Sequence, residues 1–226
     1  MLQGSLRLFF RRLSGRHLGG PHSRAMTMRV VAALFLAFAA APAAAASLSD
    51  ADKADLDRVS AYLNSIHAMK GGFLQVGPDG DVSQGEFFLV KPGRIRFQYD
   101  PPAPMLIVAD GRTVAVQNLK LNTVDRYPIS QTPLALISGD DIDLRRNSDI
   151  TGVIRQQDAL IVKAHSGNFG VHADIAFTFA EPSLELRQWA VVDNQGLLTT
   201  VSLRNAQIGV DIPSSEFILP RPSLFH

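Results

Sequence analysis

The chain of 226 residues contains no cysteine. Disulfides, thiolate metal sites and thiol nucleophiles are therefore excluded. The sequence also lacks a GxSxG motif, a pair of histidines at metal-ligand spacing and a phosphate-binding glycine loop. No set of catalytic residues can be assembled from what remains, so the sequence predicts a protein that is not an enzyme and that uses no metal or cofactor.

Acidic residues are missing from the N-terminal fifth of the chain. Residues 1–46 contain six arginines and no acid, so the formal net charge of +1 hides an uneven distribution. The rest of the chain keeps 16 basic residues (22 minus 6) against 21 acidic residues, a net charge of −5. An acidic body of this kind does not indicate a nucleic-acid partner.

The N-terminal segment has the pattern of a secretory signal peptide. A charged start precedes an apolar run from Val30 to Ala41, and small residues follow at Ala44–Ala46. This run is shorter than the ~20 residues that span a bilayer. We therefore expect residues 1–46 to be an N-terminal extension and signal peptide that is cleaved, and residues 47–226 to be a single exported, soluble domain. With no cysteine after the signal, the mature protein is not itself lipidated.

The mature region begins with a helical pattern and continues with a strand pattern. Leu56, Val59, Leu63 and Ile66 recur at helical spacing, with an N-cap at Ser49 or Asp50 and an end expected at Gly71-Gly72. The later segments alternate with period two between turn residues. The expected strands are 73–76, 82–90, 94–99, 105–109, 113–119, 123–128, 152–157, 160–164, 172–180, 185–193 and 197–208.

Short links between these strands predict antiparallel neighbours. Between the two strand series, Thr132 is expected to cap a short helix that begins at Pro133 and carries Leu134, Leu136 and Ile137. The Pro-rich C-terminus is expected to be irregular. The fold class is α+β and mostly β, and a sheet of roughly ten strands tends to curl into a partial barrel around its helices.

The stretch 87–111 holds more apolar residues than one sheet face needs. Arg94, Arg96 and Gln98 alternate with Ile95, Phe97 and Tyr99, which predicts one wet and one buried face. The flanking segments 87–90 and 105–108 are apolar throughout. The surplus fits either a core with both faces of some strands covered or a cavity lined for an apolar ligand, and the pattern does not choose between them.

Three segments together resemble a known family. They read FFLVKPGRIRFQYDPPAPMLIVADGRTVAVQN, TVDRYPISQTPLALI and LELRQWAVVDNQGLLTTVSLRNAQIGV. From about residue 48 to 217 the chain is similar to the periplasmic outer-membrane lipoprotein carrier family, LolA, in its alphaproteobacterial form. The resemblance implies a half-open barrel with a helical lid. It also implies a soluble, monomeric periplasmic chaperone that binds lipoprotein acyl chains. A periplasmic lipid- or protein-binding sensor module of related fold is the alternative.

The resemblance also implies partners and site residues. The cargo would be released by an inner-membrane ABC transporter and passed to an outer-membrane acceptor. In this family an arginine before the hairpin proline holds the lid through backbone carbonyls. Lys91 stands at that position here, and Arg94 is the second choice for the latch. Strand alternation and family position together place the following residues around the acyl-chain cavity: Leu56, Val59, Leu63, Ile66, Phe87, Leu89, Ile95, Phe97, Tyr99, Ile107, Leu134 and Ile137.

Overall fold

The computed structural model describes residues 48–166 and 173–219, so the expected signal peptide lies outside the described residues. Eleven strands form one antiparallel sheet in the order β6-β5-β4-β3-β2-β1-β11-β10-β9-β8-β7. The strands are β1 Ala68–Val76, β2 Val82–Val90, β3 Arg94–Tyr99, β4 Met105–Asp110, β5 Thr113–Asn118, β6 Thr123–Pro128, β7 Ile150–Arg155, β8 Ala159–Ser166, β9 Ala173–Ala180, β10 Leu186–Val192 and β11 Leu198–Ile208.

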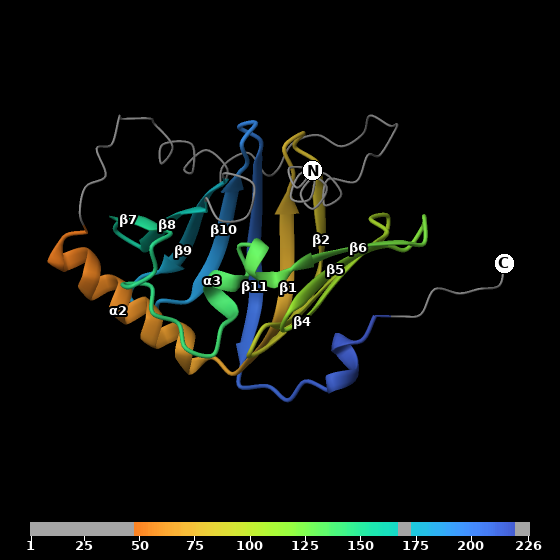
Figure 1. Cartoon of the computed structure of the whole chain (residues 1–226), viewed down its shortest axis with the longest axis horizontal. Helices are drawn as coiled ribbons and strands as arrows, with labels where there is room; N and C mark the ends of the chain where they lie inside the picture. The colour runs from red at the N-terminus through yellow and green to blue at the C-terminus, as the bar shows by residue number, and fades with distance from the viewer. Residues whose placement is uncertain (1–47, 167–172, 220–226) are drawn as a thin grey trace. The chain divides into compact units, whose positions relative to one another are not determined.

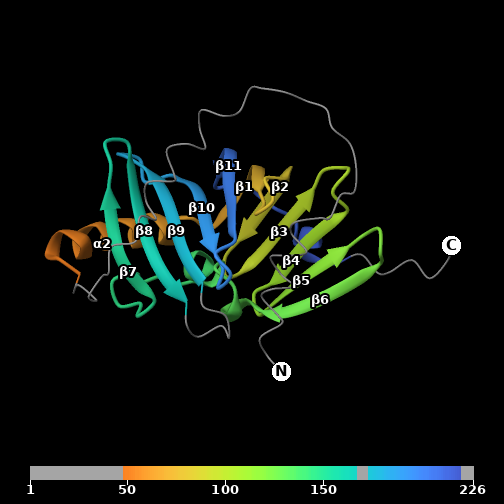
Figure 2. The ribbon, with the colours of Figure 1, turned by 90° about the horizontal axis from the view of Figure 1, so that it is seen from above.

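Two runs of hairpins build the sheet. Strands β1 to β6 form one series, strands β7 to β11 form the other, and the β1–β11 pairing joins them. Phe73 lies opposite Leu203, and Gln75 lies opposite Val201. Strands β6 and β7 remain the two edges, and Figure 2 shows the sheet bent around a concave face with these edges apart. The mostly β class and the antiparallel half-open sheet expected from the sequence are confirmed.

Helix α2 (Asp50–Ser65) covers part of the concave face. Its N-terminus is a capping box, in which the Ser49 hydroxyl accepts from the Asp52 backbone and the Asp52 carboxylate accepts from the Ser49 backbone. The apolar stripe of the helix packs into the main core. Figure 1 shows α2 crossing the β7–β10 half of the sheet.

The predicted end of this helix is wrong. The helix stops at Ser65, and Gly71 and Gly72 lie inside β1. Gly71 sits beside a bulge in the β1–β11 ladder, where a Cβ atom would lie 2.8 Å from the Arg204 carbonyl oxygen and 2.9 Å from the Phe87 ring. This glycine therefore permits the close approach of β1 and β11. In the sequence, a glycine with this role cannot be distinguished from one that ends a helix.

The central helical segment is also shorter than predicted. A 3₁₀ turn, η3 (Ile129–Gln131), precedes helix α3 (Ala135–Ser138). Thr132 does not cap α3, because its hydroxyl donates to the Ile129 carbonyl at 2.8 Å. Pro133 and Leu134 thus lie before the helix, in a turn that faces the sheet.

The C-terminal segment explains the apolar surplus on the outer face. Its 3₁₀ turn η4 (Ser214–Phe217) brings Phe217 against Leu106 and Val108, with Phe88 and Val90 packed at the margin. Segments 87–90 of β2 and 105–108 of β4 are therefore apolar throughout because both of their faces are covered. The outer face is covered by the chain's own C-terminus rather than by a helix layer.

The expectation that Arg94 and Arg96 face water is wrong for the same reason. The Arg96 guanidinium donates to the Glu216 carbonyl at 2.9 Å, and only 13% of its side chain is exposed. The Arg94 guanidinium lies 5.5 Å from the centre of the Phe217 ring, a cation–π contact. Both arginines hold the C-terminal segment on the sheet.

Candidate functional site

A cavity lies on the concave face between the sheet and the segment that leads into α3. Its wall is almost entirely apolar, with side chains from β1, β3, β4, β10 and β11. The residues that line it are Phe73, Gln75, Phe97, Tyr99, Ile107, Pro133, Leu134, Trp189, Val191, Thr199 and Val201. Strands at opposite ends of the sequence thus meet at one site because β1 pairs with β11.

Aromatic rings form the floor of this cavity. The Phe73 ring makes edge contacts with Phe97 and Tyr99, with centroids 5.1 and 4.9 Å apart. Trp189 lies edge-on to Phe97 at 6.0 Å. Edge-to-face packing of this kind fixes large apolar side chains in place, so the floor is a rigid surface for an apolar group.

One polar pair interrupts the apolar wall. The Tyr99 hydroxyl donates to the Gln75 side-chain oxygen at 2.8 Å, and both residues are buried. Burial raises the pKa of Tyr99 well above its ordinary value, because the phenolate form would lose its hydration. Tyr99 is therefore a neutral donor within the site.

The cavity is small. Its volume is about 40 Å³, which corresponds to only a few water molecules. Pro133 and Leu134 cover it from the side opposite the floor. An acyl chain does not fit into a cavity of this volume.

The structure brings the predicted cavity residues into one cluster. All twelve side chains are less than 9% exposed and belong to the main core. Four of them, Phe97, Tyr99, Ile107 and Leu134, line the cavity itself. The other eight pack around it without reaching it: Leu56, Val59, Leu63, Ile66, Phe87, Leu89, Ile95 and Ile137.

Sequence reasoning missed the half of the wall that comes from β1, β10 and β11. Phe73 and Val201 alternate with less buried neighbours on their strands, whereas Trp189 and Val191 belong to a continuous buried run on β10. Only the β1–β11 pairing places these residues beside Phe97.

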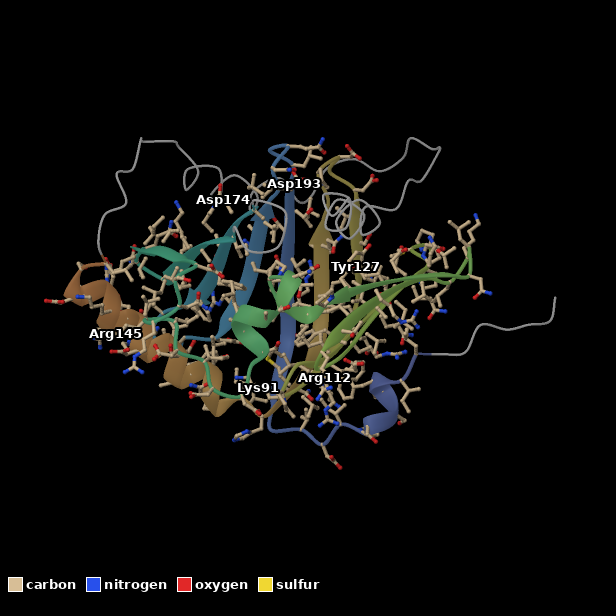
Figure 3. All side chains as sticks on the ribbon, viewed as in Figure 1. Lys91, Arg112, Tyr127, Arg145, Asp174 and Asp193 are labelled. Carbon is tan, nitrogen blue, oxygen red and sulfur yellow. The ribbon has the colours of Figure 1, made fainter. Side chains whose placement is uncertain are left out.

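The turn between β2 and β3 contacts both helices. The Lys91 ammonium donates to the Leu63 carbonyl at 2.7 Å, in the last turn of α2. This carbonyl is one of the last four of the helix; it also accepts from the Ile66 amide at 3.2 Å, and it lies at the negative end of the helix dipole. Burial lowers the pKa of Lys91, although the nearby negative charge of Asp140 opposes this effect. Figure 3 shows Lys91 near the end of α2 and below α3.

Helix α3 is held by the same turn through the backbone. The Gly93 amide donates to the Ser138 carbonyl at 2.8 Å, at the end of α3. Gly93 has a φ of 61°, and a Cβ atom there would lie 2.9 Å from Gly111 Cα. Only glycine fits this position without strain. Lys91 therefore reaches α2, Gly93 reaches α3, and Arg94 points to the outer face.

The loop after α3 is attached to α2. The Asn64 side chain bonds both the backbone amide and the carbonyl of Ile142, each at 2.9 Å. The Ser60 hydroxyl accepts from the Leu144 amide at 3.0 Å. The two helices and this loop are therefore linked to one another as well as to the β2–β3 turn.

No group of three or more His, Cys, Asp or Glu side chains that suits a metal ion occurs in residues 48–166 and 173–219. Among these same residues, no helix is long and apolar enough to cross a membrane.

Comparison with known proteins identifies the family. The model of the outer membrane lipoprotein carrier protein LolA matches residues 64–219, a span that contains the cavity, the β2–β3 turn and the C-terminal segment. The chain belongs to the LolA family.

Two curated relatives of this LolA family member carry the name outer-membrane lipoprotein carrier protein. One, from Azotobacter vinelandii, is 31% identical over 132 residues, which cover 54% of this chain and 61% of the relative. Another, from Methylobacillus flagellatus, is 27% identical over 175 residues, which cover 72% of this chain and 82% of the relative. The chain spans about half to three fifths of the length of the first few curated relatives that it matches.

Among solved structures, a LolA superfamily protein from Nitrosomonas europaea is 10% identical, with a TM-score of 0.40 over 73% of this chain and 97% of that one. The Pseudomonas aeruginosa MucA/MucB complex is 13% identical, with a TM-score of 0.45 over 74% of this chain and 61% of that one. Similarity at this level carries no argument about function.

Proposed function

We propose that this protein is a periplasmic carrier that takes the acyl chains of lipoproteins into the concave side of its sheet and moves them from the inner to the outer membrane. The observation that carries the proposal is the apolar cavity with its aromatic floor under a small helical cover. Membership of the LolA family supports it. Release from an inner-membrane ABC transporter and delivery to an outer-membrane acceptor are part of the same proposal. We further propose that the carrier works as an exported, soluble monomer after cleavage near residue 46.

The energetics of such a carrier require an opening step. Each buried CH₂ group of an acyl chain gains ~0.8 kcal/mol, so a long chain in a preformed cavity would be held too tightly to be released. A cover that closes in the empty state opposes binding, because opening it costs free energy. The small volume of the cavity and the few hydrogen bonds from the β2–β3 turn to α2 and α3 suit this role. In this proposal Lys91 is the latch on α2, and the twelve predicted cavity residues contact cargo once the cover opens.

The single tryptophan provides a direct test, because Trp189 lines the cavity. A synthetic triacylated lipopeptide with brominated acyl chains is expected to quench Trp189 fluorescence upon binding. The Val201→Phe variant should lose most of this quenching, since its ring fills the cavity. The matched control is Thr200→Phe, because Thr200 pairs with Ala190 on the other face of the same strand and should leave quenching unchanged.

Quenching that is equal in Val201→Phe and Thr200→Phe would show that the acyl chains bind elsewhere. The transport step is tested separately with spheroplasts. The wild-type protein should release lipoprotein from them in soluble form, and failure to do so would remove the carrier role even if the lipopeptide binds.

A further inference from the structure

Exposed apolar side chains gather at one end of the sheet. The β1–β2, β3–β4, β5–β6 and β10–β11 turns all leave this end, because neighbouring strands run antiparallel. We call these four turns, residues 77–81, 100–104, 119–122 and 193–197, with the adjoining Val82, the hairpin rim. In Figure 3 Asp193 marks the β10–β11 turn of this rim, and Lys91 lies at the opposite end. Six large apolar side chains are exposed among the described residues, and four belong to the rim: Val82, Leu119, Leu121 and Leu197.

The β5–β6 turn presents two of these side chains in a fixed arrangement. Leu119 is 50% exposed and Leu121 is 64% exposed, on either side of Lys120. The Asn118 side chain accepts from the Lys120 and Leu121 amides at 3.1 and 2.9 Å, an Asx turn. The Leu119 amide donates to the Pro104 carbonyl at 2.7 Å, which joins this turn to the β3–β4 turn with its exposed Pro101 and Pro102.

The rim also lies close to the cavity. Gln75, Tyr99 and Thr199 line the cavity and stand within two residues of the rim ends of β1, β3 and β11. An apolar group that left the cavity at this end of the sheet would emerge beside the rim.

We infer that the β5–β6 turn is a membrane-contact site, which inserts Leu119 and Leu121 into the surface of a phospholipid bilayer. A Leu-Lys-Leu tip suits a bilayer surface, because the leucines can enter the apolar region while the long lysine side chain keeps its ammonium among the phosphates. A protein pocket that enclosed both leucines would have to remove the hydration of this charge.

The charge of the rim indicates which lipids are needed. Asp79, Asp81, Asp100 and Asp193 outnumber Lys120 there. Attraction to anionic lipids therefore cannot drive the contact, and insertion of the leucines must do so. The inference goes beyond the proposed carrier function, because it requires no cargo and is tested on the empty protein.

The absence of native cysteine makes a local probe possible. Leu121→Cys is labelled with an environment-sensitive fluorophore, and Ile208→Cys is the matched control, because Ile208 is 47% exposed at the opposite end of the sheet. With vesicles of pure phosphatidylcholine, the probe at 121 should move to shorter wavelength and the probe at 208 should not. No shift at 121, or an equal shift at both positions, overturns the inference.

Flotation with the same vesicles provides a second measurement. Leu119→Ser/Leu121→Ser in the full chain should bind on the order of tenfold more weakly than Ile208→Ser. Residues 1–47 are identical in both variants, so any membrane binding by the apolar run Val30–Ala41 is common to both. Addition of phosphatidylglycerol should not strengthen binding. If binding appears only with phosphatidylglycerol, or if the two variants bind equally, the leucines are not the contact.

Discussion

Replacement of Lys91 by methionine tests the connection between the β2–β3 turn and α2. Methionine keeps a long apolar side chain at this half-buried position but removes the ammonium, so the Leu63 carbonyl loses a donor at 2.7 Å. A hydrogen bond to a charged donor contributes roughly 1.5–3 kcal/mol, and a cation at a helix C-terminus adds about 0.3–1 kcal/mol. Partial desolvation of the lysine, visible in its lowered pKa, offsets part of this gain.

The expected net loss is about 1–2 kcal/mol, a factor of roughly 5–30 in the closed-to-open ratio. Urea unfolding measures the stability, and a fluorescent apolar dye such as N-phenyl-1-naphthylamine measures access to the concave face. In Lys91→Met the free energy of unfolding should fall by this amount, and dye affinity should rise five- to thirtyfold. Lys91→Arg keeps a charged donor and should not raise dye affinity.

The matched control is Lys70→Met on the adjacent strand. Lys70 pairs with Phe88 on the outer face of the sheet, so this change also removes one lysine without altering α2. Equal dye affinity in Lys91→Met and Lys70→Met would mean that Lys91 is only a turn residue. A loss of stability without a change in dye affinity would mean that the bond stabilises the fold but does not control the cover.

Three further predictions concern stability. Gly71→Ala should lower the free energy of unfolding by more than about 1 kcal/mol because the new Cβ meets the Arg204 carbonyl, whereas Gly72→Ala, with no neighbour nearer than 3.7 Å, should be tolerated in the same urea titration. Phe217→Ala should cost about 3 kcal/mol by uncovering the outer-face cluster, and unchanged stability would show that the C-terminal segment is not held there. Because burial raises the pKa of Tyr99, the folded protein keeps a proton that the unfolded chain releases near pH 10, so stability should fall as pH rises above about 10. Tyr99→Phe should reduce this alkaline slope, and an unchanged slope would contradict the argument.

Features that depend on neighbouring residues in the sequence were predicted well, and features that depend on tertiary contacts were not. Strand positions were predicted almost completely, because alternation and turn residues are local signals. The predicted end of α2 and the predicted start of α3 were wrong. Gly71 is needed for close approach to strand β11 and does not end the helix, and the Thr132 hydroxyl donates to the Ile129 carbonyl instead of capping α3. Neither requirement can be read from helix signals alone.

Within the site, alternation identified Phe97 and Tyr99 as inward-facing, and alternation together with family position added Ile107. It could not place Trp189 or Val201 beside them, since that depends on the pairing of β1 with β11 across more than a hundred residues. The family resemblance also singled out Lys91 as the residue that would hold the lid through backbone carbonyls. Only the folded structure shows that Lys91 bonds the Leu63 carbonyl of α2 and that the Gly93 amide bonds the Ser138 carbonyl of α3.

By itself, then, the sequence determined the strands, the antiparallel class and the absence of thiol chemistry, because each of these depends on residue type and short spacing. The family followed from a resemblance that runs along most of the chain. Only the tertiary structure decided how the apolar surplus of residues 87–108 is used. One face closes around a small cavity, and the other is covered by the chain's own C-terminus through Phe217, Arg94 and Arg96. Alternation gives the face on which a side chain lies, but what covers that face depends on segments that are distant in the sequence and meet only when the chain folds.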